Sequence, residues 1–263
     1  MTPENLDRYT AEIQELLKDA SYKKVPVSEG SLNPYTPFKT EGQQKGPITF
    51  VQCFSWTPEA EKQRPAWESL IMGCKLAHQA IYPDCSFIEM GFNCPNSRMV
   101  PLGLFQMYAK MRRTLRGPLV FIEPDIVCNK RCDPFEAYFD IGIPDTEAHW
   151  PMMPFNPGVL FVRDTEPAQK FLDTVMEYSC SFPQNGDPWY LTQLGLSHAY
   201  LVLKDTVKIT IFPYEEYNHA PNIYAPTDAY FVHLKGNRKK LQRDFVLPIT
   251  EGRQGRLIVP PQR

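Results

Sequence analysis

Two carboxylates stand directly after one of the most apolar runs of the sequence. Residues 119–122 read LVFI, and Glu123, Pro124 and Asp125 follow at once. Such a run is typical of a strand buried on both faces, and the carboxyl ends of strands are where α/β proteins place their chemistry. Mn²⁺ and Mg²⁺ take oxygen ligands, and Mg²⁺ is often held by one or two carboxylates beside phosphates. The pair therefore predicts either a metal site or a simple turn that exposes two acids to solvent.

A histidine much later in the chain is the strongest companion of these acids. Residues 230–240 read YFVHLKGNRKK, in which His233 ends a predicted strand and leads into a basic loop that contains Gly236. An imidazole can supply a nitrogen ligand, and Lys235 and Lys239 can neutralise a diphosphate. A core histidine that serves only packing is the alternative interpretation of His233.

Two further stretches present polar groups at turns. In FNPGVLFVR (155–163), Asn156 stands two residues before Gly158, where the backbone can pass close to a ligand. In NGDPWY (185–190), a turn presents Asp187 at the start of a predicted helix. If the reaction needs an acid that positions or deprotonates an acceptor, Asp187 is the predicted residue.

Several common catalytic motifs are missing. The sequence has no GxSxG elbow, no P-loop, and no GxGxxG after its first predicted strand. Cys128 and Cys132 have no second pair of ligands at zinc-site spacing. Serine hydrolysis, Rossmann dinucleotide binding and structural zinc are therefore not favoured.

The elements that would position these groups alternate along the chain. Strands are predicted at 48–54, 86–90, 119–122, 158–162, 207–212 and 229–234. Helices are predicted at 4–24, 65–81, 104–115, 167–178 and 188–196, and residues 28–47 are expected to form a Gly- and Pro-rich connector. This alternation predicts an α/β fold with a mainly parallel central sheet and helices on both faces.

Composition sets the broad class of protein. The chain has 263 residues, and its 43% hydrophobic and 22% charged content is ordinary for a globular protein. It begins with a polar segment unlike a secretory signal, and no apolar run approaches the ~20 residues that span a bilayer. Seven cysteines at irregular spacing are expected to be reduced thiols. We therefore expect a cytoplasmic protein with no membrane span.

The net charge of −2 is unevenly distributed. Residues 231–263 carry eight Lys or Arg against two acids. This basic end of the chain is a candidate anion-binding region, and a solvated charged tail is the alternative.

The order of these motifs resembles that of GT-A-fold glycosyltransferases, in particular the glycogenin and lipopolysaccharide galactosyltransferase families. The shared order is an acidic triplet after a strand, Asn-x-Gly-Val, Gly-Asp before a helix, Phe-Pro with a later Asn, and His-x-Lys-Gly. The resemblance implies a GT-A-like catalytic domain at 47–240, with a helix and connector before it (1–46) and a basic tail after it (241–263). It also implies metal-dependent transfer of a sugar from a nucleoside-diphosphate donor, with a UDP-sugar favoured.

Roles for individual residues follow from the resemblance. Asp125 and His233 would bind Mn²⁺ or Mg²⁺, and Glu123 would bind the ion or lie near the donor ribose. Asn156 would reach the donor sugar, and Asp187 would be catalytic, although Pro188 replaces the glutamine that the family has there.

Donor contacts are implied for a further set of residues: Lys110, Glu123, Lys235, Gly236 and Lys239. The family's Lys-Pro-Trp ending is replaced here by Arg238-Lys239-Lys240. Independently of the resemblance, the first strand is expected to border the nucleotide through Val51 and Ser55.

Two rival functions remain at this stage. A nucleotidyltransferase also uses a nucleotide and carboxylate-bound Mg²⁺, but the segment after the first strand, QCFSWTPEAEKQR, lacks the glycines of its usual loop. A non-catalytic nucleotide-sugar-binding module would account for Glu123 and Pro188 at positions where the family has other residues. For a transferase, a glycan is the favoured acceptor, and a DNA base or a protein is an alternative.

Overall fold

The computed structural model describes most of the chain between residues 37 and 251. The described residues are 37–41, 47–58, 60–94, 100–146, 154–180, 191–221, 224–236, 239 and 242–251. The helix predicted at 4–24 and the candidate acid Asp187 lie outside them. Most of the predicted connector also lies outside them, but its residues Pro37–Glu41 form strand β1.

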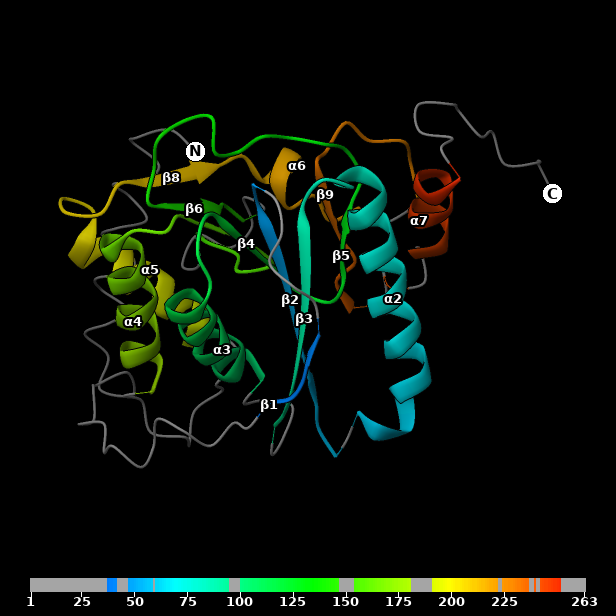
Figure 1. Ribbon diagram of the computed structural model, residues 1–263, viewed down its shortest axis with the longest axis horizontal. Coiled ribbons are helices and arrows are strands. Elements are labelled where there is room, and N and C mark those ends of the chain that lie inside the picture. The colour runs from blue at the N-terminus through cyan, green and yellow to red at the C-terminus, as the bar shows by residue number, and fades with distance from the viewer. Residues whose placement is uncertain are drawn as a thin grey trace.

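A seven-stranded sheet forms the centre of the molecule (Figure 1). Its order in space is β1, β3, β2, β4, β7, β6, β8. After β1 these strands span Thr49–Trp56 (β2), Ser86–Asn93 (β3), Leu119–Ile122 (β4), Ile141–Pro144 (β6), Val159–Val162 (β7) and Ile209–Phe212 (β8). Strands β1 and β7 run antiparallel to their neighbours, and the other five share one direction. The predicted mainly parallel sheet is confirmed.

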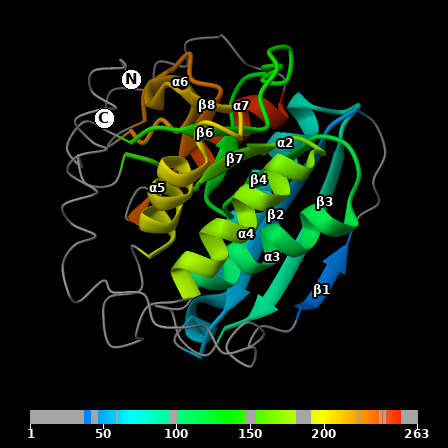
Figure 2. The ribbon, with the colours of Figure 1, turned by 90° about the vertical axis from the view of Figure 1, so that its left-hand side faces the viewer.

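Helices cover both faces of this sheet, as predicted (Figures 1 and 2). One face carries α3 (Val100–Thr114), α4 (Glu166–Cys180) and α5 (Leu191–Leu203). The other carries α2 (Arg64–Ile81), against which α7 (Gln242–Thr250) packs. Helix α7 thus occupies part of the segment predicted as a basic tail. Among the described helices, none combines the length and the apolar character needed to cross a bilayer.

The two faces follow from the alternation of side chains along the strands. On β2, Val51 and Cys53 point into the core shared with α3, whereas Phe50 points to the opposite face. Helix α2 has Pro65 in its first turn, and its buried residues recur at the spacing of one helical face. These patterns explain why the central strands and α2 were predictable.

A second, two-stranded sheet lies beside α2. Strands β5 (Ile126–Cys128) and β9 (Phe231–His233) pair antiparallel, with Ile126 opposite His233. Val127 and Val232 pack into the apolar cluster formed with α2 and α7. This small sheet joins two segments that are distant in sequence, and it places β9 next to the carboxyl end of β4.

Candidate metal centre

The acidic pair lies in a tight turn between two strands. The backbone N–H of Glu123 donates to the carbonyl of Gly158 at 2.9 Å, and that of Ile126 donates back to the carbonyl of Glu123 at 3.2 Å. Asp125 is only 7% exposed, and Glu123 is half-buried. The alternative prediction of two solvent-exposed acids is therefore wrong for Asp125.

Backbone pairing carries His233 to this turn. Because Ile126 pairs with His233, the two chains run side by side, and the N–H of Leu234 donates to the carbonyl of Asp125 at 2.9 Å. On the other side of β5, Nε2 of His78 on α2 lies 3.3 Å from the carbonyl of Ile126. Burial lowers the pKa of His78 to about 3, so its ring is neutral and can donate to that carbonyl without carrying a charge.

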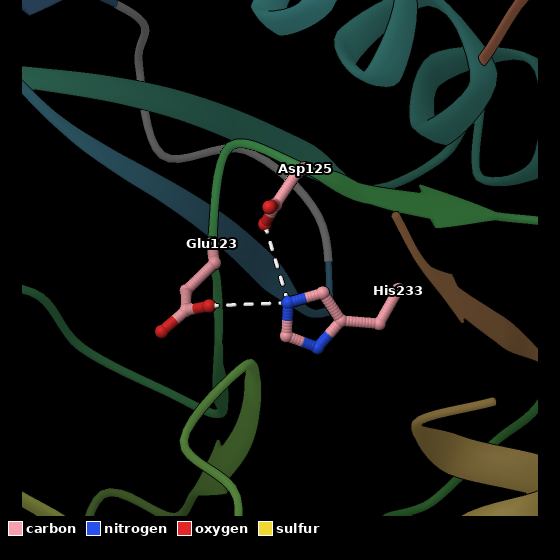
Figure 3. Close-up of side chains that lie close together, drawn as sticks. All are labelled: Glu123, Asp125 and His233. Carbon is pink, nitrogen blue, oxygen red and sulfur yellow. Dashed lines mark ion pairs between the residues drawn. The ribbon is translucent and has the colours of Figure 1, made fainter. Parts of the chain in front are cut away.

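Three side chains converge at the turn (Figure 3). Nε2 of His233 lies 3.3 Å from Oδ1 of Asp125 and 3.4 Å from Oε2 of Glu123. One ligand atom from each residue lies within 4.8 Å of the other two, and His233 is 3% exposed. No second group of three such ligands occurs in the described part of the chain.

Lys239 completes the charge distribution around Asp125. Its Nζ lies 2.8 Å from Oδ2 of Asp125 and 4.9 Å from the ring centroid of Trp67 on α2. Burial acts to raise the pKa of Asp125, but His233, in its protonated form, and Lys239 outweigh it and hold that pKa below its ordinary value. Asp125 is therefore a carboxylate, with one oxygen toward His233 and the other toward Lys239.

Gly158 allows this packing because it has no side chain. A Cβ at that position would lie 2.7 Å from both Cε1 and Nδ1 of His233 and 2.9 Å from Oδ1 of Asn156. Asn156 is buried, and its Oδ1 accepts the backbone N–H of Gly158 at 2.9 Å. The asparagine thus shapes the backbone against which the histidine ring lies.

The chemistry of the three side chains fits a divalent cation. Two carboxylates and an imidazole are ligands that Mn²⁺ accepts, and Mg²⁺ favours the carboxylates. The group also lies at the carboxyl edge of a parallel sheet, where α/β proteins bind ligands.

The remaining predicted residues are placed differently. Val51 is fully buried in the core, which argues against the predicted donor contact, whereas Ser55 near the end of β2 is half-buried. Lys110 is exposed and follows Tyr108 by two residues, so the helix directs it away from the sheet on which Tyr108 packs. Lys235 is half-buried next to the exposed Gly236, which has a φ of 55°.

Sequence reasoning missed two polar residues at the site. Oδ1 of Asn218 lies 2.8 Å from Nδ1 of His233, and the only signal for it was its place soon after Phe212-Pro213. The hydroxyl of Tyr108 is buried and has no hydrogen-bond partner among the described residues. Burial, together with the negative charges of Glu123 and Asp125, raises the pKa of Tyr108. Its apolar neighbours on α3 gave no sign of a polar role in the sequence.

Comparisons with known proteins gave matches only among solved structures. No family model and no curated protein matches the sequence. A glycosyltransferase involved in the glycosylation of the major capsid of PBCV-1 has a TM-score of 0.49 and 16% identity, over 75% of this chain and 98% of that chain. The glycosyltransferase GlyE of Streptococcus pneumoniae TIGR4 has TM-scores of 0.47 (11% identity) and, in its apo form, 0.48 (10% identity).

The GlyE matches cover 79% and 80% of this chain but 63% of each GlyE chain, which is less than two thirds. The structures to which this chain is similar are therefore glycosyltransferases. Similarity at these TM-scores assigns no activity, so function must be inferred from the site.

Proposed function

We propose that the protein is a metal-dependent glycosyltransferase that uses a nucleoside-diphosphate sugar, with a UDP-sugar favoured. One observation carries the proposal: Glu123, Asp125 and His233 converge at the carboxyl edge of the sheet, beside Lys239. The motif order in the sequence gives independent support. The favoured acceptor is a glycan, and a DNA base or a protein is an alternative.

In this proposal Asp125 and His233 hold Mn²⁺ or Mg²⁺, and Glu123 either joins them or contacts the donor ribose. When bound, the ion would act as a Lewis acid that stabilises the negative charge developing on the departing diphosphate. The chain adds its own cations, because Lys239 is within reach of the same carboxylate and Lys235 lies in the same loop. Both lysines would neutralise the diphosphate as it leaves.

Other residues have proposed roles around the sugar. Asn156 accepts a hydrogen bond from Gly158, which lies against the histidine ring, and would contact the donor sugar. Ser55 would lie near the nucleotide. Asp187 would position or deprotonate the acceptor. These assignments rest on the sequence resemblance and on the place of each residue in the chain.

The direct test has two stages. Calorimetry of UDP binding is measured with and without Mn²⁺, and UDP-, GDP- and other nucleotide sugars are then screened for Mn²⁺-stimulated hydrolysis. The proposal expects UDP to bind tightly only with the ion, and at least one donor to be hydrolysed.

Two other outcomes would decide against it. Metal-dependent UDP binding without turnover of any donor would identify a non-catalytic binding module. Release of pyrophosphate from a nucleoside triphosphate, with no donor hydrolysis, would identify a nucleotidyltransferase.

A further inference from the structure

The orientation of the His233 ring can be read from its second nitrogen. Nδ1 lies 2.8 Å from Oδ1 of Asn218, and an amide oxygen can only accept a hydrogen bond. With the amide in this orientation, the proton of the hydrogen bond is on Nδ1. A neutral imidazole carries one ring proton, so Nε2 is left with a lone pair.

That lone pair is directed at the two acids. Figure 3 shows both dashed lines, from Glu123 and from Asp125, ending on the same nitrogen of His233. An unprotonated nitrogen and two carboxylate oxygens are all acceptors, and at 3.3–3.4 Å they repel one another unless a proton or a metal ion lies among them. The arrangement is thus suited to an ion at this point.

Asn218 is held firmly in position. Its backbone N–H donates to the carbonyl of Tyr214 at 3.0 Å, at the end of helix α6 (Tyr214–Tyr217). The next residue, His219, donates to Phe231 at 3.1 Å and accepts from the N–H of His233 at 2.7 Å. Residues 218–220 therefore run along β9, and the amide and the ring that it contacts are fixed by the same backbone pairing.

The ring itself has little freedom to turn over. Gly158 lies against Cε1 and Nδ1 so closely that a single added carbon would overlap them. Asn218 is fully buried, and its Nδ2 has no hydrogen-bond partner among the described residues. A buried amide with an unpaired N–H₂ group is costly, so a residue chosen only for packing would be apolar. The hydrogen bond between its oxygen and His233 is the interaction that accounts for an amide at this buried position.

We propose that Asn218 is a positioning residue that fixes His233 in the tautomer with its proton on Nδ1, so that Nε2 is presented to a divalent cation shared with Asp125 and Glu123. This inference rests on the proposed function in one respect, namely that the cation is a metal ion. It does not depend on the donor or on the acceptor.

The test is a two-bond ¹H–¹⁵N correlation spectrum of the full chain labelled at histidine, recorded without metal at a pH above the ordinary titration range of imidazole. His233→Gln identifies the ring signals of His233. The expected result is a protonated Nδ1 and an unprotonated Nε2. A proton on Nε2 in the wild-type protein would overturn the proposal without any further variant.

Two matched variants then separate positioning from packing. Asn218→Asp keeps an acceptor oxygen and should keep the tautomer, whereas Asn218→Leu keeps the branching at Cγ and removes the acceptor. In Asn218→Leu the tautomer preference should be lost, and Mn²⁺ affinity, measured by electron paramagnetic resonance of the unbound ion, should fall about 10–100-fold. If Asn218→Leu folds with unchanged tautomer and with Mn²⁺ affinity within about twofold of wild type, Asn218 has no positioning role.

Failure of this inference is distinguishable from failure of the proposed function. A chain that binds Mn²⁺ and shows the predicted tautomer but hydrolyses no donor refutes the transferase and upholds the role of Asn218. A chain that transfers sugar but has the proton on Nε2 upholds the transferase and refutes the role of Asn218.

Discussion

Two clusters of charged residues, one at each end of β4, differ in whether their polar atoms are matched by partners. Near the start of β4, Arg112 is almost fully buried, but each of its contacts has the complementary polarity. Its guanidinium donates to the carbonyl of Gly117 at 2.6 Å, to the carbonyl of Leu115, and to Asp164 at 2.9 Å. Near the end of the same strand, Nε2 of His233 and oxygens of Glu123 and Asp125 face one another.

The difference separates structural charges from functional ones. Arg112 is satisfied by its own neighbours and ties the end of α3 to the start of β4, so nothing more is needed there. The cluster of Glu123, Asp125 and His233 at the other end lacks a partner of opposite polarity. Its converging atoms are all hydrogen-bond acceptors unless a proton or a metal ion joins them. Four residues of buried strand hold these two groups apart.

The largest expected effect comes from neutralising one acid in each group. Asp125→Asn should lower the rate of sugar transfer about a thousandfold, because a metal ligand worth several kcal/mol in the transition state is lost. Its melting temperature should stay within a few degrees of wild type. Asp164→Asn should instead lower the melting temperature by several degrees and leave the rate nearly unchanged.

Steady-state kinetics and calorimetry of the two variants check this contrast. Equal loss of activity in both variants, or an unchanged rate in Asp125→Asn, would show that the acid near His233 is not more important for activity than the acid near Arg112.

A smaller effect is expected when the ring of His233 is displaced. In Gly158→Ala the new Cβ would lie 2.7 Å from the ring, so the ring or the backbone must move, and Mn²⁺ affinity should fall about 10–100-fold. Gly142→Ala is the matched control, because its Cβ would overlap Phe212 in the core. Overpacking of this kind typically costs about 1–3 kcal/mol in either place.

Titration of Mn²⁺ binding and urea unfolding of both variants separate the two effects. Similar loss of Mn²⁺ affinity in Gly142→Ala would show that general destabilisation, rather than ring position, controls the site.

Removing the charge of Lys239 should have a more modest effect. Lys239→Met keeps an unbranched side chain beside Trp67 but removes the cation, so UDP affinity with Mn²⁺ should fall about tenfold. Lys208→Met, which removes a lysine stacked on the exposed Tyr138, should bind UDP normally. Calorimetry at low and moderate salt measures both, and equal affinities for the two variants would exclude Lys239 from the donor site.

The last effect is on stability rather than on activity, and it concerns the support of β5 by His78. The pKa of His78 is lowered from 6.5 to about 3 by burial. Between these pH values the imidazole is therefore protonated in the unfolded chain and neutral in the folded chain. Stability from this residue is therefore complete above about pH 6.5 and declines as the pH falls, with a limiting slope of about 1.4 kcal/mol per pH unit.

Urea unfolding of wild type and His78→Leu from pH 7 down to pH 4 measures this contribution as the difference between the two curves. Curves that stay parallel through that window would show that His78 does not supply this pH dependence.

Most of the fold was predictable because its signals are local. The apolar runs of β2, β3, β4 and β7 and the periodicity of α2 each specify an element within one window of sequence. β1 was missed because it lies in a Gly- and Pro-rich segment, β5 because three residues carry too little pattern, and β6 because its four residues include a glycine and a proline.

The site was predictable in part. Acid residues after a buried strand and a histidine before a basic loop are visible in the sequence, and the structure brings Glu123, Asp125 and His233 together. The β5–β9 pairing that does so has no local signal. Asn218 and Tyr108 could not be assigned, because their relation to the acids and to His233 exists only after the chain has folded. The strand alternation that buries Val51 was visible and should have argued against a donor contact.

The proposed function and the role of Asn218 both depend on one divalent ion shared by Asp125 and His233. Crystals of the full chain soaked with Mn²⁺ and UDP, with anomalous diffraction recorded near the manganese edge, test it most directly. We expect one strong anomalous peak about 2.2 Å from a carboxylate oxygen of Asp125 and from Nε2 of His233, in contact with the diphosphate. UDP bound at this edge of the sheet with no anomalous peak between the two side chains would contradict it.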